Sequence, residues 1–429
     1  MAGRARTSIG RITAGMDGQE AAVAGWVVTV RAHGAISFAT ISDSTGEILL
    51  VAKRGECADG LVSQVASLRP HTSVSARGVI RSSSKAPGGR EMAPSGLDVL
   101  SEASRAPPFE PTALTVRNID TRLGARYIDL RRPPVRHVFL ARARALSAVR
   151  RYLEGEDFVE VSTPKLISSA TEGGAALFAI FFYDKQAFLA QSPQLYKEQL
   201  VMGLDRVYEI GPIFRAEASR TPRHLAEAVS IDIEESFAGY GEAMSRAEGV
   251  VRAAAGAVAE HAAENPSSGI TPPEIGVIPR HTYSEMIERV RAAGAGAEWG
   301  DDLYPSHLKK AGMEGFYFVT DWPLAPKPFY VRGSPGDPRT SESFDLMYGD
   351  LEVSSGSSRI SCRADLERRL ADKGLDPAAF GHHLGAFDYG MPPHAGFGIG
   401  LERLMMALTG SQNIRDVALY PRDVDRLVP

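Results

Sequence analysis

The pattern of hydrophobic and polar positions in the first hundred residues predicts short β-strands. Apolar and β-branched residues gather in the runs AAVAGWVVTVRA, ISFATIS, GEILLVAKR and TSVSARGVIRS, and turn-forming segments such as AHGA, DSTGE and SKAPGGRE separate them. Several short strands joined by Gly-rich turns within about a hundred residues favour a small closed barrel. The OB-fold is the leading candidate for this N-terminal domain, which we place at residues 1–104.

The pattern changes after a polar, Pro-rich segment, SEASRAPPFEP. Residues 105–134 form a predicted linker that contains the arginine-rich stretch RNIDTRLGARYIDLRR. From Val135 apolar residues recur at helical spacing and predict a helix that ends near Gly155. Strand-like and helical segments then alternate, so we assign residues 135–429 to a second domain. Within it, an insertion is expected at about residues 240–315.

Composition restricts the class of protein. The chain has 429 residues, of which 44% are hydrophobic and 23% charged, as in an ordinary globular protein of two or three domains. Its net charge of −4 argues against binding of polyanions over the whole surface but leaves room for a local basic face. The two cysteines, Cys57 and Cys362, cannot form a disulfide framework or a structural zinc site.

Nothing in the sequence predicts a membrane protein. The longest apolar run, from Ala175 to Tyr183, is much shorter than the roughly 20 residues that a membrane span needs. The N-terminal segment MAGRARTSIGRITAG is charged but has no apolar region typical of a secretory signal. Together with the low cysteine content, these features predict a cytoplasmic protein with no membrane partner.

Four separate segments carry the candidate chemistry. In the first, Ser192 and Pro193 begin a predicted helix, which places Gln194 and Lys197 on one face of its first turn. In the second, Arg215 and Glu217 are expected on one face of a strand, and a loop brings Arg223 and His224 back. Two arginines so placed suit a polyphosphate, although a surface ion-pair ladder is the simpler alternative.

The third and fourth segments lie nearer the C-terminus. Asp345, Glu352 and Ser355 fall on strand-like positions, where one or two carboxylates together with substrate phosphates could hold Mg²⁺. The segment GFGIGLER follows, and its glycines would let a ligand lie close to the backbone while Arg403 opens a helix. This segment lacks the third glycine of the dinucleotide-binding fingerprint, and no GxxxxGK[ST] phosphate loop is present.

Taken in order, these segments resemble the signature motifs of class II aminoacyl-tRNA synthetases. VEVSTPKL resembles motif 1, FRAE with RHLAE resembles motif 2, and GFGIGLER resembles motif 3. The N-terminal barrel is similar to that of the aspartate, asparagine and lysine subgroup, in which an OB-fold reads the anticodon. ATEGGAALF, QSPQLYKE and NIRDVALYPRD are similar to aspartyl enzymes of the archaeal and eukaryotic type. The resemblance implies an α+β protein whose catalytic domain has an antiparallel sheet flanked by helices.

The resemblance also implies an activity. Such an enzyme joins L-aspartate to ATP, releases pyrophosphate, and transfers the aspartyl group to the 3′ end of tRNA(Asp). Mg²⁺ is the expected cofactor, and motif 1 implies a homodimer. Whether tRNA(Asn) is a second substrate stays open. The alternatives are an asparaginyl-tRNA synthetase, an asparagine synthetase on the same catalytic fold, and a catalytically silent RNA-binding paralogue. The presence of Arg215, Glu352 and Arg403 argues against the last.

Matching positions assign roles to individual residues by resemblance. The catalytic residues would be Arg215 and Arg403. The aspartate-binding residues would be Glu172, Gln194, Lys197, Arg215, Ser355 and Arg359. The ATP-binding residues would be Arg215, Ala216, Glu217, Arg223, His224, Leu225, Glu352, Gly400, Leu401, Glu402 and Arg403. The Mg²⁺ ligands would be Glu352, Ser355 and Asp345.

Lys197 is the main reason to expect aspartate as the amino acid. Two cations, Lys197 and Arg359, around a side-chain carboxylate favour aspartate, and neutral asparagine would leave them unpaired at a cost of about 3–5 kcal/mol. Asparaginyl enzymes otherwise resemble this chain but lack this lysine.

Three residues of the first domain match positions that read tRNA in the family. Phe38 is a candidate stacking platform for an anticodon base, and a place in the barrel core is its alternative. Lys85 matches the form that charges a single tRNA, whereas Val28 replaces the tryptophan expected there. These two indications disagree, so the sequence leaves the tRNA range open.

Overall fold

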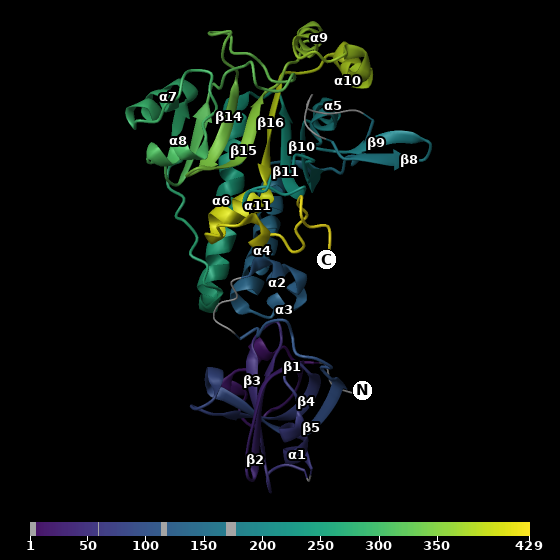
Figure 1. Ribbon diagram of the computed structural model, residues 1–429, viewed down its shortest axis with the longest axis vertical. Coiled ribbons are helices and arrows are strands. Elements are labelled where there is room, and N and C mark those ends of the chain that lie inside the picture. Colours follow the sequence, from purple (N-terminus) through teal and green to yellow (C-terminus); the bar gives the residue numbers. More distant parts are fainter. Residues whose placement is uncertain (1–5, 59, 113–117, 169–176) are drawn as a thin grey trace. The chain divides into compact units, whose positions relative to one another are not determined.

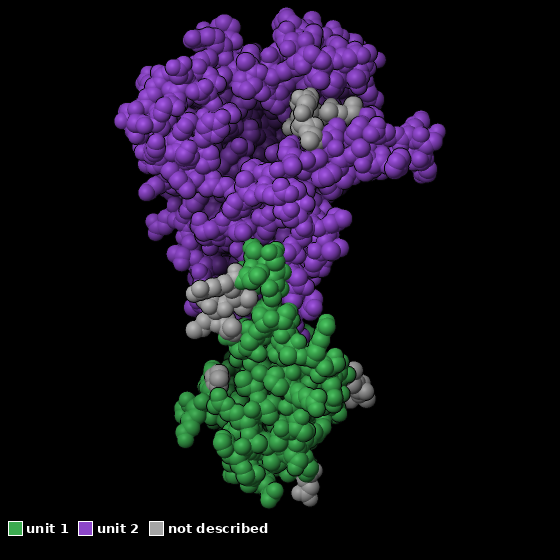
Figure 2. Space-filling model, viewed as in Figure 1, with its two compact units in different colours: residues 1–122 green, residues 123–429 purple. Residues whose placement is uncertain are grey.

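A computed structural model describes residues 6–58, 60–112, 118–168 and 177–429. The chain forms two compact units, Met1–Arg122 and Leu123–Pro429 (Figure 2). Helix α2, Ile119–Gly124, crosses the boundary between them. Within the described residues, no helix is long and apolar enough to cross a membrane.

The first unit contains a closed five-stranded barrel, which confirms the predicted OB-fold. The strands pair in the order β1-β2-β3-β5-β4, and β4 returns to β1. Their bounds are β1 Glu20–His33, β2 Ile36–Ser42, β3 Glu47–Lys53, β4 Ser73–Ser82 and β5 Arg90–Ser101. Alternate residues such as Val23, Ile41 and Leu50 fill the interior, as the two-residue period of a strand requires. The pattern did not predict the short helix α1, Leu61–Ser67, which adds Leu61 and Val65 to this core.

The second unit is built on an eight-stranded sheet, and its class is the α+β class predicted (Figure 1). Its strand order is β12-β13-β14-β15-β16-β11-β10-β6, with antiparallel pairing except at the two end pairs. The bounds are β6 Val159–Glu160, β10 Arg206–Phe214, β11 Glu227–Ser236, β12 Arg280–Thr282, β13 Phe316–Thr320, β14 Ser343–Tyr348, β15 Leu351–Ser358 and β16 His394–Gly400.

Three helices pack with this sheet to form the main core. They are α4 Pro133–Gly155, α6 Tyr240–Glu264 and α11 Leu401–Thr409. Small residues bring α4 and α6 close together, because a side-chain carbon at Gly249 would lie only 2.0 Å from the Tyr152 hydroxyl oxygen. The segment predicted as an insertion, about residues 240–315, therefore begins with a helix of the core. The α4 helix ends at Gly155, as its periodicity predicted.

Further helices and a small sheet complete the unit. The helices are α3 Arg126–Asp129, α5 Gln194–Leu204, α7 Tyr283–Ala292, α8 Pro305–Lys310, α9 Arg363–Asp372 and α10 Gly381–Ala386. The strands are β7 Leu166–Ile167, β8 Ala179–Phe182 and β9 Lys185–Leu189, paired in the order β7-β9-β8. Helices α7 and α8 pack with β13, and α9 and α10 pack with the segment Phe329–Val331.

A buried arginine joins the start of this unit to its C-terminal segment. Arg126 is fully buried and donates hydrogen bonds to the carbonyl oxygens of Leu419 at 2.9 Å, Arg415 at 2.6 Å and Ala418 at 3.0 Å. It also forms an ion pair with Asp129 at 2.9 Å. We expect Arg126→Met to lower the free energy of unfolding by about 3–5 kcal/mol, because it leaves a buried carboxylate and several carbonyl groups without this partner. Urea-induced unfolding measures the change.

Arg144→Met is the matched control for this prediction. Arg144 pairs with Glu264 on the surface, and exposed ion pairs contribute at most about 1 kcal/mol. A loss at Arg126 no larger than the loss at Arg144 would contradict the structural role assigned to Arg126.

Candidate active site

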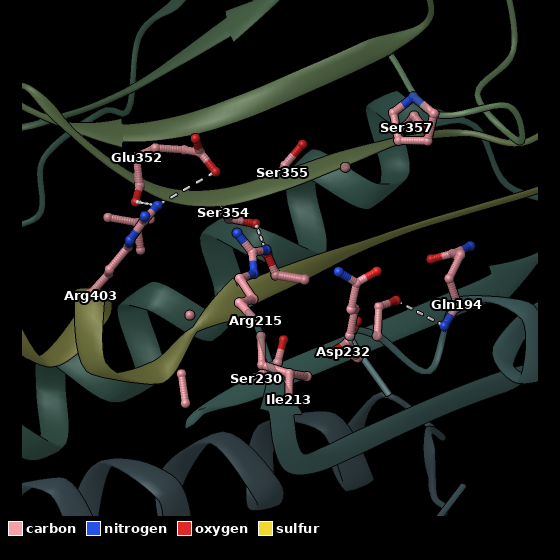
Figure 3. A pocket seen from close by; sticks show the side chains of 18 of the residues that line it. Gln194, Ile213, Arg215, Ser230, Asp232, Glu352, Ser354, Ser355, Ser357 and Arg403 are labelled. Atoms are coloured by element: carbon pink, nitrogen blue, oxygen red, sulfur yellow. Dashed lines mark hydrogen bonds and ion pairs between the residues drawn. The ribbon is translucent and has the colours of Figure 1, made fainter. Parts of the chain in front are cut away.

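A cleft of about 310 Å³ opens in the second unit (Figure 3). Its walls come from the start of α5, from β11, β15 and β16, from the loop after β10, and from a segment around Lys327 and Tyr330. The central strands lie side by side in the order β15-β16-β11. Residues that pair across them share one face of the sheet. Gly398 pairs with Asp232 on one side and with Ser355 on the other, which places a carboxylate and a hydroxyl group across a glycine.

A second glycine of the same strand makes room for a protein side chain. Gly396 pairs with Glu234 and Ser357, and a side-chain carbon at this position would lie 2.2 Å from a carboxylate oxygen of Glu234. The expectation that these glycines admit a ligand therefore needs a correction at Gly396. There the close neighbour is Glu234, whereas Gly398 and Gly400 do line the cleft.

One end of the cleft holds a cluster of paired charges. Lys197 is fully buried on the first turn of α5, and its Nζ lies 2.9 Å from Oδ1 of Asp232 and 3.6 Å from Oε2 of Glu234. Arg359 is 4% exposed and donates to both carboxylate oxygens of Glu234, at 2.9 and 3.2 Å. The two cations predicted for the aspartate pocket are thus brought together, each beside a protein carboxylate.

Gln194 connects this cluster to the start of α5. Its Oε1 accepts a hydrogen bond from Arg359 at 3.2 Å, and its Nε2 donates to Glu198 at 2.7 Å. Ser192 caps the helix through its Oγ, which accepts from the backbone N–H of Gln194 at 3.0 Å. Gln194 and Lys197 therefore lie on the face of α5 that the helical spacing predicted, although only Gln194 lines the cleft.

Arginines gather at the other end of the cleft, and Arg215 lies between the two ends (Figure 3). Arg403 donates to the backbone carbonyl oxygen of Glu352 at 3.0 Å, and its guanidinium lies 3.7 Å from the Glu352 carboxylate. Arg223 binds Asp350 through its carboxylate at 2.7 Å and its carbonyl oxygen at 2.8 Å. Burial, together with the charges of Arg403 and Arg215, lowers the pKa of His224. This end is therefore suited to an anion.

Arg215 differs from the other two arginines. Its backbone N–H donates to the carbonyl oxygen of Ala226 at 2.8 Å, which holds the start of the loop after β10. Within the described ranges its guanidinium makes no hydrogen bond or ion pair, and the side chain is exposed to the cleft. Its donors are thus available to a ligand.

The residues predicted to hold Mg²⁺ lie on neighbouring strands. Asp345 on β14 pairs with Ser355 on β15, and Glu352 lies further along β15. Burial raises the pKa of the Asp345 carboxyl group. Lys327, 3.4 Å away, lowers this pKa, whereas the negative charge of Glu352 raises it further. A divalent cation would relieve that repulsion, so the donor set fits Mg²⁺. The described residues contain no cluster of three metal-binding side chains, so substrate oxygens would complete the coordination.

Several predicted residues lie outside the lining of the cleft. Strand β10 ends at Phe214, so Arg215 and Glu217 follow the strand and do not lie on it as predicted. Ala216 and Glu217 are not lining residues, and Leu401 is buried in the main core. Leu225, Ser355 and Glu402 do line it.

Glu402 lines the cleft, but protein groups hold its carboxylate. The carboxylate accepts from the backbone N–H of Val229 at 3.0 Å and pairs with Arg142 at 2.8 Å, so its contacts are internal. Glu172, the predicted partner of the substrate ammonium group, lies outside the described residues.

The structure adds residues to which the sequence assigned no role. Asp232 and Glu234 pair with Lys197 and Arg359, and these pairs join segments far apart in the chain. Lys327 and Tyr330 line the cleft, with Arg359 lying 5.2 Å from the centre of the Tyr330 ring. No motif or spacing in the sequence distinguished Lys327 from an ordinary surface lysine.

The predicted tRNA-reading residues lie on the barrel of the first unit. Phe38 is half-buried on β2 and points away from the core, which its neighbours Ser37 and Ala39 face. The alternative that Phe38 is a core residue is therefore wrong, because the barrel interior takes the other residues of the strand. Val28 lies at a β-bulge of β1, and Lys85 is exposed in the turn between β4 and β5.

This sheet, with a row of arginines and a cleft on its antiparallel centre, defines a class II aminoacyl-tRNA synthetase. The family model described as "tRNA synthetases class II (D, K and N)" matches residues 118–424, and one described as "OB-fold nucleic acid binding domain" matches residues 21–100. The chain belongs to the class II synthetase family for aspartate, lysine and asparagine.

Curated relatives and solved structures agree on the family. The chain is 45% identical to the aspartate–tRNA(Asp/Asn) ligase of Methanocaldococcus jannaschii over 96% of both chains. It is also 45% identical to the ligase of the same name from Methanothermobacter thermautotrophicus, again over 96% of both chains. Among solved structures, asparaginyl-tRNA synthetase from Pyrococcus horikoshii, complexed with asparaginyl-adenylate, has a TM-score of 0.90 and 29% identity, and the match covers 99% of this chain and 100% of that one.

Proposed function

We propose that the chain is an aspartate–tRNA ligase that charges both tRNA(Asp) and tRNA(Asn). One observation carries the proposal: relatives that match 96% of the chain at 45% identity bear the name aspartate–tRNA(Asp/Asn) ligase. Of the two barrel positions, Val28, which replaces the expected tryptophan, agrees with the dual range, whereas Lys85 matches the form that charges a single tRNA.

The choice of aspartate over asparagine is supported by the paired charges of the cleft. The asparaginyl enzyme from Pyrococcus horikoshii shares the fold, so the fold alone does not choose between the two amino acids. Lys197 and Arg359 balance Asp232 and Glu234, so an added carboxylate meets a cluster whose negative charge is already neutralised. A neutral amide would gain less from these cations.

The residues of the cleft account for amino-acid activation without an enzyme nucleophile. The α-carboxylate oxygen of aspartate attacks the α-phosphorus of ATP, a new P–O bond forms, and the bond to the leaving pyrophosphate breaks. Arg215 lies between the two ends of the cleft, which supports a role in binding the α-phosphate and neutralising charge that develops there. Arg223, His224 and Arg403 would hold the outer phosphates and adenine. Transfer to a ribose hydroxyl of tRNA then releases AMP.

Mg²⁺ belongs to this proposal as the expected cofactor. Asp345, Glu352 and Ser355 would hold it together with phosphate oxygens, and the bound ion would neutralise phosphate charge. The protein side chains still position aspartate and the α-phosphate, so loss of the ion should abolish activation but leave aspartate binding measurable.

Pyrophosphate exchange with ATP tests the activation step. Purified protein is assayed with Mg²⁺ and aspartate, asparagine or lysine, in the absence of tRNA. We expect exchange with aspartate alone, followed by charging of both tRNA(Asp) and tRNA(Asn). Exchange with asparagine would overturn the amino-acid assignment, and no exchange with any of the three would favour the RNA-binding paralogue. Charging of tRNA(Asp) alone would overturn the dual range.

The barrel residue Phe38 gives a prediction about tRNA. We expect Phe38→Ala to raise the KM for tRNA roughly tenfold, because stacking of a base on an aromatic ring contributes about 1–3 kcal/mol. Pyrophosphate exchange, which needs no tRNA, should stay unchanged. Phe38→Tyr keeps the ring and is the control, and an unchanged KM for tRNA in the alanine variant would contradict the stacking role.

A homodimer is the proposed quaternary state. The helix and strand of the motif 1 region expose Leu140 and Val159, which are 42% and 43% accessible. Apolar side chains exposed on these two elements would be covered in a two-fold contact through motif 1. Light scattering coupled to size-exclusion chromatography distinguishes a dimer from the 46.1 kDa monomer.

A further inference from the structure

A buried acidic and histidine cluster lies behind the amino-acid end of the cleft. Glu198 on α5, His383 on α10 and His394 at the start of β16 are all buried, with exposed fractions of 0–3%. Oε2 of Glu198 lies 3.3 Å from Nε2 of His383 and 3.6 Å from Nε2 of His394. None of the three lines the cleft, and the activation chemistry uses none of them.

The neighbours of each histidine indicate its protonation. In His394, Nδ1 lies 2.8 Å from the carbonyl oxygen of Pro392, and Nε2 faces the Glu198 carboxylate. Both partners only accept, so the ring serves them best with a proton on each nitrogen. In His383, Nδ1 faces the Nε2 amide donor of Gln199, so a single proton on Nε2 suffices.

Electrostatics agree with this arrangement. Burial alone would raise the pKa of Glu198, but the close pairing with His383 and His394 outweighs it and holds that pKa well below its usual value. Burial alone would lower the pKa of His394, whereas Glu198, and after it Glu234, raises it. Glu198 is thus a carboxylate that only accepts hydrogen bonds.

The second oxygen of Glu198 reaches the cleft through Gln194. Oε1 of Glu198 accepts from Nε2 of Gln194 at 2.7 Å. When Nε2 of Gln194 donates to Glu198, Oε1 of the same amide points away from Glu198. This oxygen accepts a hydrogen bond from Arg359 at 3.2 Å. Oε2 of Glu234 accepts from the same nitrogen at 3.4 Å. Glu198 is thus the nearer of the two carboxylates that hold the Gln194 amide with its oxygen toward Arg359.

The same cluster sets the local charge. Lys197 and Arg359 are balanced by Asp232 and Glu234, and Glu198 adds one further negative charge. An imidazolium at His394 balances that charge. With His394 neutral, the buried groups would carry a net negative charge, which disfavours an acidic amino acid.

We propose that Glu198, held by His383 and His394, is a positioning residue for aspartate: it orients Gln194 toward Arg359 from behind the cleft. This inference rests on the proposed assignment of aspartate to that end of the cleft. Glu198 acts on aspartate only through Gln194 and takes no part in the reaction, so we expect its loss to change the KM for aspartate.

Glu198→Gln is the decisive variant, because it keeps the size of the side chain and removes the charge. A glutamine can donate as well as accept, so the nearer obligatory acceptor for Nε2 of Gln194 is lost and only the longer contact with Glu234, at 3.4 Å, remains. His394 loses the carboxylate that raises its pKa, so in the neutral form it leaves the cluster balanced and only the charged hydrogen bond is lost. In pyrophosphate exchange we then expect the KM for aspartate to rise roughly tenfold. The KM for ATP and kcat should stay within about twofold.

Glu209→Gln is the matched control. Glu209 is a buried carboxylate of β10 that binds Thr163 and Lys165 and does not line the cleft. A merely structural role for Glu198 predicts that both variants lose thermal stability and active fraction, with the KM for aspartate unchanged. That outcome would overturn the inference.

The pH dependence gives a second readout that needs no variant. Four groups surround His394: Glu198 on α5, His383 on α10, Glu234 on β11 and the segment of Arg359 that follows β15. In the wild type the KM for aspartate should rise as the pH passes through the raised pKa of His394 and the ring loses its proton, while the KM for ATP stays level. In Glu198→Gln the rise should move to lower pH, because His394 loses its carboxylate partner.

The outcomes separate this inference from the proposed function. A wild type that exchanges with aspartate, combined with a KM for aspartate that neither pH nor Glu198→Gln changes, overturns only the positioning role. A wild type that shows no exchange with aspartate overturns both. If the Glu198→Gln variant fails to fold, the wild-type pH profile and His383→Gln, which keeps a donor toward Glu198, decide the question.

Discussion

Replacement of Lys197 by methionine is expected to lower kcat/KM for aspartate about a thousandfold, the equivalent of about 4 kcal/mol. Lys197 is fully buried beside Asp232 and Glu234, and methionine has a similar length without the charge. The two carboxylates would then exceed Arg359 in charge and repel the carboxylate of the amino acid. ATP, which we propose to bind at the opposite end with the arginines, should keep its affinity. Pyrophosphate exchange and an ATP-binding measurement test both halves.

The control must separate loss of recognition from loss of folding, because a buried carboxylate without its cation destabilises the protein. Lys165→Met breaks a comparable pair with Glu209 at 2.7 Å, away from the cleft lining. The double variant Lys197→Met with Asp232→Asn restores the charge balance, so it should recover stability and the part of aspartate activation that the repulsion had removed. If Lys197→Met keeps wild-type aspartate kinetics, the pocket assignment is wrong.

The fold was largely predictable because local patterns determine its elements. Alternation of apolar residues indicated the barrel strands, and the 3.6-residue spacing indicated α4 to its last residue. Where packing with distant segments decides, the pattern was insufficient. The Ala-rich α6 looked like the start of an insertion, although its small residues serve close contact with α4 in the core.

Part of the cleft lining was predictable from the sequence, but the contacts among its residues were not. Ser192 and Pro193 marked the start of α5, so helical spacing alone was enough to place Gln194 and Lys197 on one face. The partner of Gln194, Arg359, lies 165 residues further along the chain, and no local spacing reports such a contact. Glycine provides a similar case: its small size at Gly396 was expected, but the neighbour that requires it, Glu234, was not.

Replacement of Arg215 by alanine is expected to reduce pyrophosphate exchange by roughly a hundredfold to a thousandfold, because a fixed donor to the developing charge at phosphorus contributes about 3–4 kcal/mol. The guanidinium makes no hydrogen bond within the described ranges and is exposed to the cleft, so the free energy of unfolding should stay within about 0.5 kcal/mol of the wild type. This combination distinguishes Arg215 from Lys197, whose loss affects both folding and activity. Arg215→Lys keeps the charge without the two-pronged geometry and should recover only part of the rate.

Arg220→Ala provides the control on the same loop. Arg220 is an exposed arginine that pairs with Asp425 and lies outside the cleft lining, so its loss removes a positive charge without removing a donor to substrate. Its exchange rate should match the wild type. Equal losses at Arg215 and Arg220 would mean that the overall positive charge of the loop matters and that Arg215 has no specific contact with the α-phosphate. A large loss of exchange at Arg215 alone, at unchanged stability, would support a contact between its guanidinium and the reacting phosphate. The fold is then intact, and the lost rate reports lost stabilisation of the transition state.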